Sequence, residues 1–270
     1  MSCSGGKRAD LGRALCVITG ASRGFGRALA RGLSGPAAAA LGAGAGGSLR
    51  RRAAQQAELA ASEAGRAGLV VRCVVADLAE PEAPGRVVEA CQQVFADGME
   101  HVLLVNNAAS LGDVSRYART FTTRAEVDSY MSLNISSCLC LTACVLQAFP
   151  QRPGVQRTVV NVSSLCAQQP FSSWVLYCTA KAARDMMFRV LAAEEPELRV
   201  LSYAPGSGPL DTDMFSAARA TTADPGLRRT FSDMSAQGRV LTPEQSCSKL
   251  MELLLEDTYQ SGAHVGLLRH

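Results

Sequence analysis

One stretch decides how this chain folds: Leu15-Cys-Val-Ile-Thr-Gly-Ala-Ser-Arg-Gly-Phe-Gly26. Its first residues form a short β-rich apolar run, and the helical segment Arg27 to Leu33 follows the glycines. This order of strand, glycine turn and helix suits a dinucleotide, because the pyrophosphate approaches bare backbone and rests on the positive end of the helix. The glycine spacing is Gly-x-x-x-Gly-x-Gly instead of the commoner Gly-x-Gly-x-x-Gly, and such clusters also occur in ordinary tight turns.

Apolar runs downstream alternate with helical segments. We expect strands near 15–18, 38–41, 69–75, 101–105, 158–162, 198–203 and 264–268, and helices over 27–33, 127–149, 174–195 and 243–256. Such alternation produces βαβ units and a parallel sheet. The sequence therefore predicts an α/β fold: a single-domain, Rossmann-like doubly wound sheet of seven mostly parallel strands with helices on both faces.

The second expected strand is the weakest part of this pattern. It lies within Pro36 to Gly47, a run rich in glycine that lacks the β-branched residues typical of strands. We still place a strand near 38–41. In this arrangement residues 12–110 form mainly the cofactor-binding half, and residues 111–270 form the catalytic and substrate-binding half.

Length and composition favour one globular domain over residues 1–270. The chain is 47% apolar and 19% charged, and no charge block divides it. A net charge of +3 with interspersed signs gives no reason to expect nucleic acid or a membrane as a partner. No secretory h-region follows the N-terminus and no uninterrupted apolar run reaches the length of a membrane span, so we expect a cytoplasmic protein.

Ten cysteines and three histidines raise the question of disulfides or a metal. The cysteines are scattered and lie largely inside apolar runs, which is typical of packed, reduced thiols. The histidines have no paired spacing of the kind that metal ligands show. We therefore expect no metal site.

Tyr177 and Lys181 are four residues apart in a segment with helical periodicity, so they share one helix face. A nearby ammonium is expected to lower the tyrosine pKa toward the working pH, which suits general acid–base catalysis. Ser164 follows the apolar run 158–162, so its hydroxyl is expected at the carboxyl end of a strand, where open parallel sheets bind ligands. Taken alone, Tyr-x-x-x-Lys is also compatible with a solvated helix face.

The cofactor preference depends on the residues after the glycine turn. An NAD-specific site places an acid about 20 residues beyond the fingerprint, and this chain has none there. Arg23 and the run Arg50-Arg51-Arg52 instead offer planar cations that suit a 2′-phosphate, so NADP is preferred, although the arginine run also suits a solvated helix start. Asp77 closes the third strand and either contacts the adenine amino group or caps the next helix.

A polar stretch follows the sixth strand and extends to about residue 242. Long loops in compact domains usually act as lids or binding elements. We expect a substrate loop at about 205–242.

Several motifs occur in one order along the chain and together carry a family resemblance. They are Thr19-Gly-x-x-x-Gly-x-Gly26, Asp77-Leu78, Asn106-Asn107-Ala108, Asn134, Ser164, Tyr177-x-x-x-Lys181 and Pro205-Gly206. With this set the chain resembles the short-chain dehydrogenase/reductase family over nearly its full length. The resemblance implies an NADP-dependent oxidoreductase with NADP(H) as cofactor.

Within that family the chain is most similar to members that reduce carbonyl groups on a pterin side chain. This similarity is carried by Ser110-Leu-Gly-Asp-Val-Ser115, Ser164-Leu-Cys-Ala167, Gln169-Pro-Phe171, Trp174, Tyr177-Cys178, Lys181-Ala-Ala-Arg-Asp-Met186, Pro209-Leu-Asp-Thr-Asp-Met214 and Ser261-Gly-Ala-His-Val265. It implies NADPH-dependent pterin reduction in the last steps toward tetrahydrobiopterin. It also implies a cytosolic homodimer that pairs the helices 127–149 and 174–195.

The resemblance assigns roles to individual residues. Tyr177 protonates the carbonyl oxygen as hydride arrives, and Ser164 hydrogen-bonds the same oxygen. Lys181 lowers the tyrosine pKa and holds the nicotinamide ribose, while Asn134 seats a water that relays protons to Lys181. Cofactor contacts are implied for Gly20, Ser22, Arg23, Gly24, Phe25, Gly26, Arg50, Asp77, Leu78, Asn107, Ala108, Tyr177, Lys181, Gly206, Leu210 and Thr212. Substrate contacts are implied for Ser164, Cys166, Phe171, Tyr177, Met214 and Gly266.

Three positions depart from the pattern of the relatives. Gly266 stands where pterin reductases have an acid, Ser207-Gly208 lengthens the substrate loop, and Ala109 replaces a glycine. A carboxylate that grips an amino-pyrimidine edge is a strong anchor, so its loss leaves a broader carbonyl reductase of dicarbonyls or quinones as an alternative. The glycine-rich second strand leaves a further alternative, a non-catalytic NADP-binding regulatory protein.

Overall fold

The computed structural model describes residues 10–32, 39–43, 70–206 and 208–266. The strands are β1 (Ala14–Thr19), β2 (Ala39–Ala43), β3 (Val70–Val74), β4 (His101–Asn106), β5 (Gln156–Val162), β6 (Arg199–Ala204) and β7 (Ala263–Gly266). They form one sheet in the order β3-β2-β1-β4-β5-β6-β7, and every neighbouring pair is parallel. The predicted α/β fold with a parallel sheet is confirmed.

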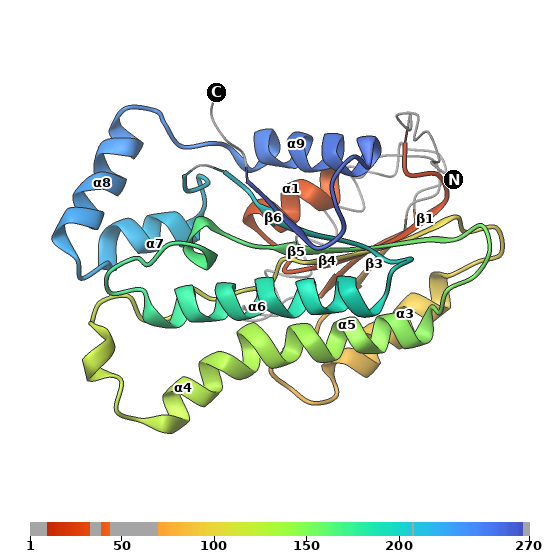
Figure 1. The fold of residues 1–270 in the computed structure, drawn as a ribbon, viewed down its shortest axis with the longest axis horizontal. Coiled ribbons are helices and arrows are strands. Elements are labelled where there is room, and N and C mark those ends of the chain that lie inside the picture. The colour runs from red at the N-terminus through yellow and green to blue at the C-terminus, as the bar shows by residue number, and fades with distance from the viewer. Residues whose placement is uncertain (1–9, 33–38, 44–69, 207, 267–270) are drawn as a thin grey trace.

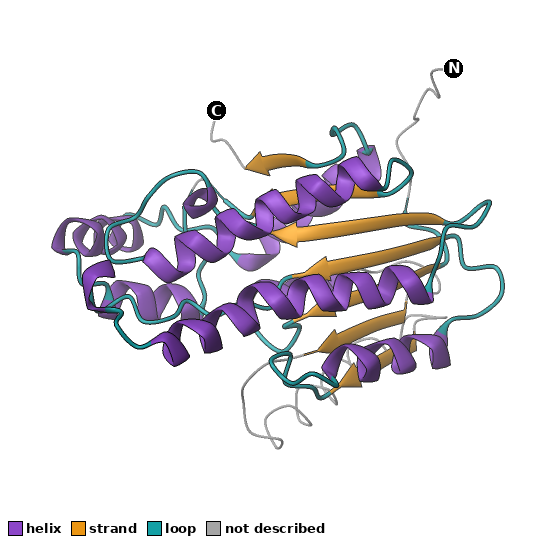
Figure 2. Ribbon diagram, turned by 60° about the horizontal axis from the view of Figure 1, so that its bottom comes forward, coloured by secondary structure: helices purple, strands orange, loops and turns teal. Residues whose placement is uncertain are grey.

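Helices cover both faces of this sheet (Figures 1 and 2). One face carries α1 (Gly24–Gly32) and α9 (Pro243–Glu256), and the other carries α3 (Ala83–Val94), α5 (Ser137–Ala148) and α6 (Val175–Glu194). Each layer has its own core, in which side chains of alternating direction from β1 and β4 meet the helices above and below. The sheet is therefore buried between two helical layers, and its carboxyl edge is left for binding.

The strand expected near 38–41 is present as β2, although its sequence is Ala-Ala-Leu-Gly-Ala. It pairs in register with β1 on one side and with β3 on the other. A strand that is hydrogen-bonded along both edges needs little help from side-chain propensity. The residues between 44 and 69, including Arg50, lie outside the described residues.

The expectation that 205–242 forms one long loop is wrong, whereas the role of this segment in substrate binding stays a prediction. The segment contains α7 (Asp213–Thr221) and α8 (Pro225–Ala236), which lie beyond one end of the sheet (Figure 1). The Thr212 hydroxyl and the Asp224 carboxylate cap the two helices, and Pro225 occupies the first turn of α8. Buried Phe215 and Phe231 then fasten both helices to the core beneath them.

The helical segment expected at 127–149 begins earlier and is divided by an irregular turn. It consists of α4 (Arg124–Met131), a π-helical turn at Ser132–Ser136, and α5. The continuous helix Arg124–Ala148 has 25 residues and is apolar enough to cross a membrane by length and composition alone, although polar residues interrupt its apolar run. One side of α5 packs on the core through buried Cys138, Leu141 and Val145, so this helix is a layer of the fold.

Candidate active site

The glycine turn after β1 is closed tightly by the end of β4. The Asn107 side chain donates from Nδ2 to the Thr19 carbonyl at 2.8 Å, and the Thr19 hydroxyl accepts from the Asn107 and Ala108 amides at 2.9 Å each. A Cβ at Gly26 would lie 2.4 Å from the Gly20 carbonyl oxygen, and Gly20 has φ +67°. The turn therefore requires glycine at both positions. The hydrogen bond from the Asn107 side chain holds the start of the turn in place.

The start of α7 lies against the same turn. A Cβ at Gly24 would lie 3.2 Å from the Thr212 side chain, and Arg23 forms an exposed ion pair with Asp213 at 3.7 Å. A Cβ at Gly20, Gly24 or Gly26 would crowd neighbouring protein atoms, so this turn stays bare backbone, and α1 begins within it at Gly24. The N-terminus of a helix favours an anion. These residues fit the diphosphate of a dinucleotide, with Arg23 at the rim.

The other predicted cofactor residues differ in their exposure. Ser22, Gly206 and Leu210 are half-buried, Phe25 and Leu78 are buried in the core, and Asp77 is exposed at the end of β3. The Asp77 carboxylate accepts from the Ala79 amide at 3.0 Å and does not cap α3, whose N-cap is Glu82. Asp77 is thus held in a turn at the carboxyl edge of the sheet. Ala109 does not have positive φ, so alanine is unstrained there.

The predicted catalytic residues come together at the carboxyl end of β5. Ser164 begins the short helix η3 (Leu165–Ala167), and its hydroxyl accepts from the Cys166 amide at 3.2 Å. Tyr177 and Lys181 lie on α6 with the lysine Nζ 5.4 Å from the tyrosine ring centroid. Lys181 is buried and donates to the Val162 carbonyl at 2.6 Å, which fixes its ammonium beside the strand that leads to Ser164.

The sequence expectation that the pKa of Tyr177 is lowered is wrong. Burial raises the pKa of Tyr177 above its ordinary value, against the opposing effect of a hydrogen bond with Ser164. Burial, with Arg184 close by, also lowers the pKa of Lys181 to about 7. A desolvated ammonium is only partly charged at neutral pH, so it cannot offset the desolvation of the phenol. Tyr177 is therefore a neutral phenol that can donate a proton.

Asn134 is buried in the π-helical turn. Its Oδ1 accepts from the Ser110 amide at 2.8 Å, and its Nδ2 donates to the Tyr130 carbonyl at 2.9 Å. The Ser137 amide donates to the Ser132 carbonyl across this turn, in the spacing of a π-helix. Such turns often accompany functional sites, because they redirect one residue without ending the helix.

Arg184 is a structural part of the site that the sequence reasoning missed. It is 1% exposed, and it donates from Nε to Asn161 Oδ1 at 2.9 Å and to the carbonyls of Asn106 and Ala108. It follows Lys181 by three residues, so the helical spacing that pairs Tyr177 with Lys181 could have found it. The apolar positions at that spacing, such as Met186 and Val190, are instead exposed.

Aromatic side chains form the wall beside Tyr177. The Trp174 ring lies 5.5 Å from the Tyr177 ring and 5.7 Å from that of Phe171, and its indole N–H donates to the Thr222 hydroxyl. An open cavity of about 680 Å³ adjoins this wall and is lined by Tyr117, Ala118, Arg119, Pro170, Phe171, Ser172, Ser173, Val175, Cys178 and Thr179. The cavity reaches predicted substrate residue Phe171 but is not lined by Ser164, Tyr177 or Lys181.

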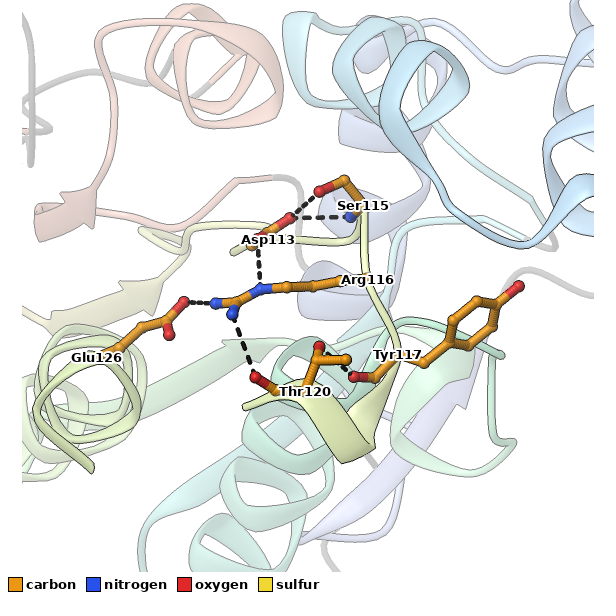
Figure 3. Close-up of polar contacts among 6 residues, drawn as sticks. All are labelled: Asp113, Ser115, Arg116, Tyr117, Thr120 and Glu126. Atoms are coloured by element: carbon orange, nitrogen blue, oxygen red, sulfur yellow. Dashed lines mark hydrogen bonds and ion pairs between the residues drawn. The ribbon is translucent and has the colours of Figure 1, made fainter. Parts of the chain in front are cut away.

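An arginine network holds the loop that presents Tyr117 to this cavity (Figure 3). Arg116 donates from Nε to Asp113 at 2.7 Å, forms an ion pair with Glu126 of α4, and lies 4.1 Å from the Phe121 ring centroid. Hydrogen bonds from the Ser115 side chain and amide hold the pKa of Asp113 below its usual value. The loop is therefore tied to α4.

Two thiols flank the predicted catalytic residues. Cys166 is buried and Cys178 is half-buried, and a hydrogen bond from Cys166 lowers the pKa of Cys178 to about 7. The described cysteines are all free thiols. Of the other predicted substrate residues, Met214 is half-buried on α7 and Gly266 is exposed at the end of β7.

No group of three or more His, Cys, Asp or Glu side chains is placed to hold a metal ion within 10–32, 39–43, 70–206 and 208–266. The sequence expectation of no metal site remains a prediction.

Comparison with known proteins identifies relatives of the whole chain. The family model described as short chain dehydrogenase matches residues 14–223. Sepiapterin reductase of Bos taurus is 48% identical over 270 residues and covers 98% of both chains. Sepiapterin reductase of Xenopus laevis is 49% identical over 260 residues, which cover 94% of this chain and 95% of the relative.

A solved structure gives the same result for the fold. The crystal structure of the KRED1-Pglu enzyme superposes with a TM-score of 0.78 at 27% identity and covers 93% of this chain and all of that one. The likeness extends over the sheet and both helical layers, since nearly the whole of both chains is aligned.

Proposed function

Because this chain belongs to the short-chain dehydrogenase family, we propose that it is an NADPH-dependent reductase of pterin side-chain carbonyls, a sepiapterin reductase. The observation that carries this is the 48% identity to a sepiapterin reductase over 98% of both chains. The site supports it, because Ser164, Tyr177 and Lys181 lie together at the end of β5. The chain is an oxidoreductase, so a purely regulatory role is set aside. In the cell it serves the last steps toward tetrahydrobiopterin.

The glycine turn and α1 hold the cofactor's diphosphate in this proposal. When bound, NADPH supplies the hydride that reaches the carbonyl carbon. Arg23 offers its guanidinium to the 2′-phosphate, and this contact replaces an exposed ion pair with Asp213, which is weak in water. Arg23 in this role favours NADPH over NADH.

Tyr177 is the acid of the reduction. Its hydroxyl gives its proton to the carbonyl oxygen of the substrate, and the Ser164 hydroxyl donates a hydrogen bond to the same oxygen. The raised pKa of Tyr177 keeps the phenol protonated before the step, which is the form that reduction requires. Lys181 then stabilises the phenolate that remains, and a water seated by the backbone near Asn134 returns a proton through Lys181.

The first test is the variant Tyr177→Phe with sepiapterin and NADPH. We expect turnover to fall by at least ~10²-fold, because the acid is removed, with NADPH affinity nearly unchanged. Turnover is measured as loss of NADPH absorbance, and affinity by the fluorescence of bound NADPH. Equal turnover in both proteins would refute the mechanism, and no turnover of sepiapterin by the unaltered protein would refute the substrate.

A second candidate is a broader carbonyl reductase that acts on dicarbonyls or quinones. Gly266 favours it, because the relatives' acid is missing at the exposed end of β7. A Cβ at this position meets only ordinary contact with Ala204 at 3.8 Å, so Gly266→Asp is sterically acceptable. We expect this variant to raise kcat/KM for sepiapterin relative to a dicarbonyl by ~10-fold, through one charge-assisted contact. Unchanged selectivity would show that the missing acid does not decide the substrate.

A cytoplasmic homodimer completes the proposal. Leu139 of α5 is 52% exposed, and Met186 and Val190 of α6 are 54% and 46% exposed. These side chains stand on neighbouring helices of one layer (Figure 1). Exposed large apolar side chains that gather on one face are typical of a protein interface. We assign this face to a second copy of the chain.

A further inference from the structure

One largely buried carboxylate on the side of α6 that faces the sheet takes no direct part in the reaction described above. Asp185 lies one helical turn after Lys181, and its side chain is 13% exposed. Its Oδ1 accepts from Asn161 Nδ2 at 2.9 Å and from Ser163 Oγ at 2.5 Å. Its Oδ2 lies 2.6 Å from Nδ1 of His264, whose side chain is 15% exposed. A carboxylate so fully engaged has a fixed orientation.

The partners of Asp185 surround the point where the catalytic lysine docks. Asn161 and Ser163 flank Val162, and the Val162 carbonyl accepts from Lys181 Nζ at 2.6 Å. Ser164 follows directly on the same strand end. Asp185 therefore fastens α6 to β5 on both sides of the lysine contact, so the helix that carries Tyr177 and the strand end that carries Ser164 are held together.

Lys181 is buried, and few groups nearby stabilise its ammonium form. The negative charge of Asp185 is one of them. The titratable and charged groups that affect it are Arg184 and Asp185 of α6, Cys138 of α5 and Cys166 of η3. Burial and Arg184 favour the neutral amine, whereas the Asp185 carboxylate favours the ammonium. Asp185 in turn faces His264 of β7 and the neutral side chains of Asn161 and Ser163.

We propose that Asp185 is a positioning residue for the reduction: it places a negative charge near Lys181 and fixes the Tyr177 helix to the strand end of Ser164. His264 holds the Asp185 carboxylate from β7, the strand that ends at Gly266. This inference rests on the proposed function, since it assigns the proton chemistry to Tyr177 and Lys181.

The test is the kcat–pH profile of Asp185→Asn with sepiapterin and NADPH. Asparagine keeps the size and one acceptor oxygen of aspartate but removes the charge. We expect kcat at neutral pH to fall ~10-fold, and the basic limb, where Lys181 loses its proton, to move about one pH unit lower. The KM for NADPH should stay within ~2-fold, because the cofactor cradle is untouched.

Asp257→Asn is the matched control. Asp257 accepts from Arg199 Nε at 2.8 Å and is 29% exposed, but Arg199 begins β6 at the opposite edge of the sheet. This variant should have lower thermal stability, but the basic limb of its kcat–pH profile should lie where it does in the unaltered protein. If the limb of Asp185→Asn also stays in place, the inference is overturned.

A second pair of variants covers the case in which Asp185→Asn does not fold. His264→Asn retains an N–H donor near the place of Nδ1, and His264→Val removes it while suiting a strand. We expect near-normal kcat in the first and a ~10-fold loss in the second, with both folded by circular dichroism. Equal kcat in both overturns the role of His264. The variant Tyr177→Phe distinguishes failure of the proposed function from failure of this inference. If Tyr177→Phe stays active, the proposed function fails. If Tyr177→Phe is inactive but the basic limb of the kcat–pH profile does not move in Asp185→Asn, only this inference is refuted.

Discussion

Lys181 shows at the scale of one residue how catalysis and stability oppose each other. The side chain is 3% exposed and donates to the Val162 carbonyl, yet its burial lowers its pKa from 10.5 to about 7. In the unfolded chain the same lysine is protonated throughout the neutral range. Between these two pKa values the unfolded state binds more protons than the folded state, so stability rises with pH. The functional position of this lysine therefore lowers the stability of the fold near neutral pH.

The variant Lys181→Met tests this cost directly. Methionine has a similar length and needs no proton, so its stability should not follow this titration. We expect the free energy of unfolding of the unaltered protein to rise by about 2 kcal/mol relative to Lys181→Met between pH 7 and pH 9. Urea denaturation at both pH values measures this difference, and turnover should be lost in the variant. A difference that does not change with pH would contradict the titration of Lys181.

At the scale of elements, α9 depends on a reciprocal cap at its start. The Thr242 hydroxyl accepts from the Gln245 amide at 3.2 Å, and Gln245 Oε1 accepts from the Thr242 amide at 2.9 Å. Pro243 occupies the first turn, where its missing N–H costs nothing. Buried Leu250 and Leu254 then hold α9 on the sheet beside α1. The cap thus fixes the helix that covers the cofactor half.

Thr242→Ala should lower the free energy of unfolding by about 1 kcal/mol, because one amide of the first turn loses its partner. Urea denaturation followed by circular dichroism measures this loss. The matched control is Thr230→Ala, an exposed threonine inside α8 whose hydroxyl donates to the Gly226 carbonyl. Alanine favours a helix interior, so the control should be neutral or slightly more stable. Equal losses in both variants would show that the cap is not the cause.

The elements differ in how far the sequence could predict them. Strand β4 and helix α9 could be predicted from their apolar runs and, for α9, its cap. In both, the structure that the local sequence favours is the one that the fold requires. The helices α7 and α8 were missed, because their polar surfaces resemble a loop and only Phe215, Ala218 and Phe231 are buried in them. Burial also reversed the expected pKa of Tyr177, since desolvation depends on neighbours that spacing does not show.

At the scale of the whole molecule, one helical layer carries exposed apolar side chains. The outer side of α5 and α6 exposes Leu139, Met186 and Val190, while their inner sides pack on the sheet. The apolar residues that recur at helical spacing along α6 thus lie on its outer face. A helix with apolar residues on both sides is typical of a layer buried between the sheet and a partner.

Met186→Asp should convert the proposed dimer to a monomer, because a carboxylate would be desolvated at the interface. Light scattering coupled to size exclusion measures the molar mass. Ser232→Asp is the control: it adds the same charge on exposed α8, next to Arg228, and should leave the mass unchanged. If the unaltered protein is already a monomer, or if Met186→Asp keeps the mass of a dimer, this assignment of the face is wrong.

The π-helical turn at Ser132–Ser136 joins the two halves of the long helix. A π-turn holds about one residue more than an α-turn, so deletion of Ile135 would convert it to an ordinary α-turn and leave the later side chains of α5 in phase. Leu139 would stay on the outer face and Leu141 in the core, while Asn134 would lose its register with Ser110. The additional residue of this turn therefore serves the placement of Asn134, and the core and outer surface of α5 do not depend on it.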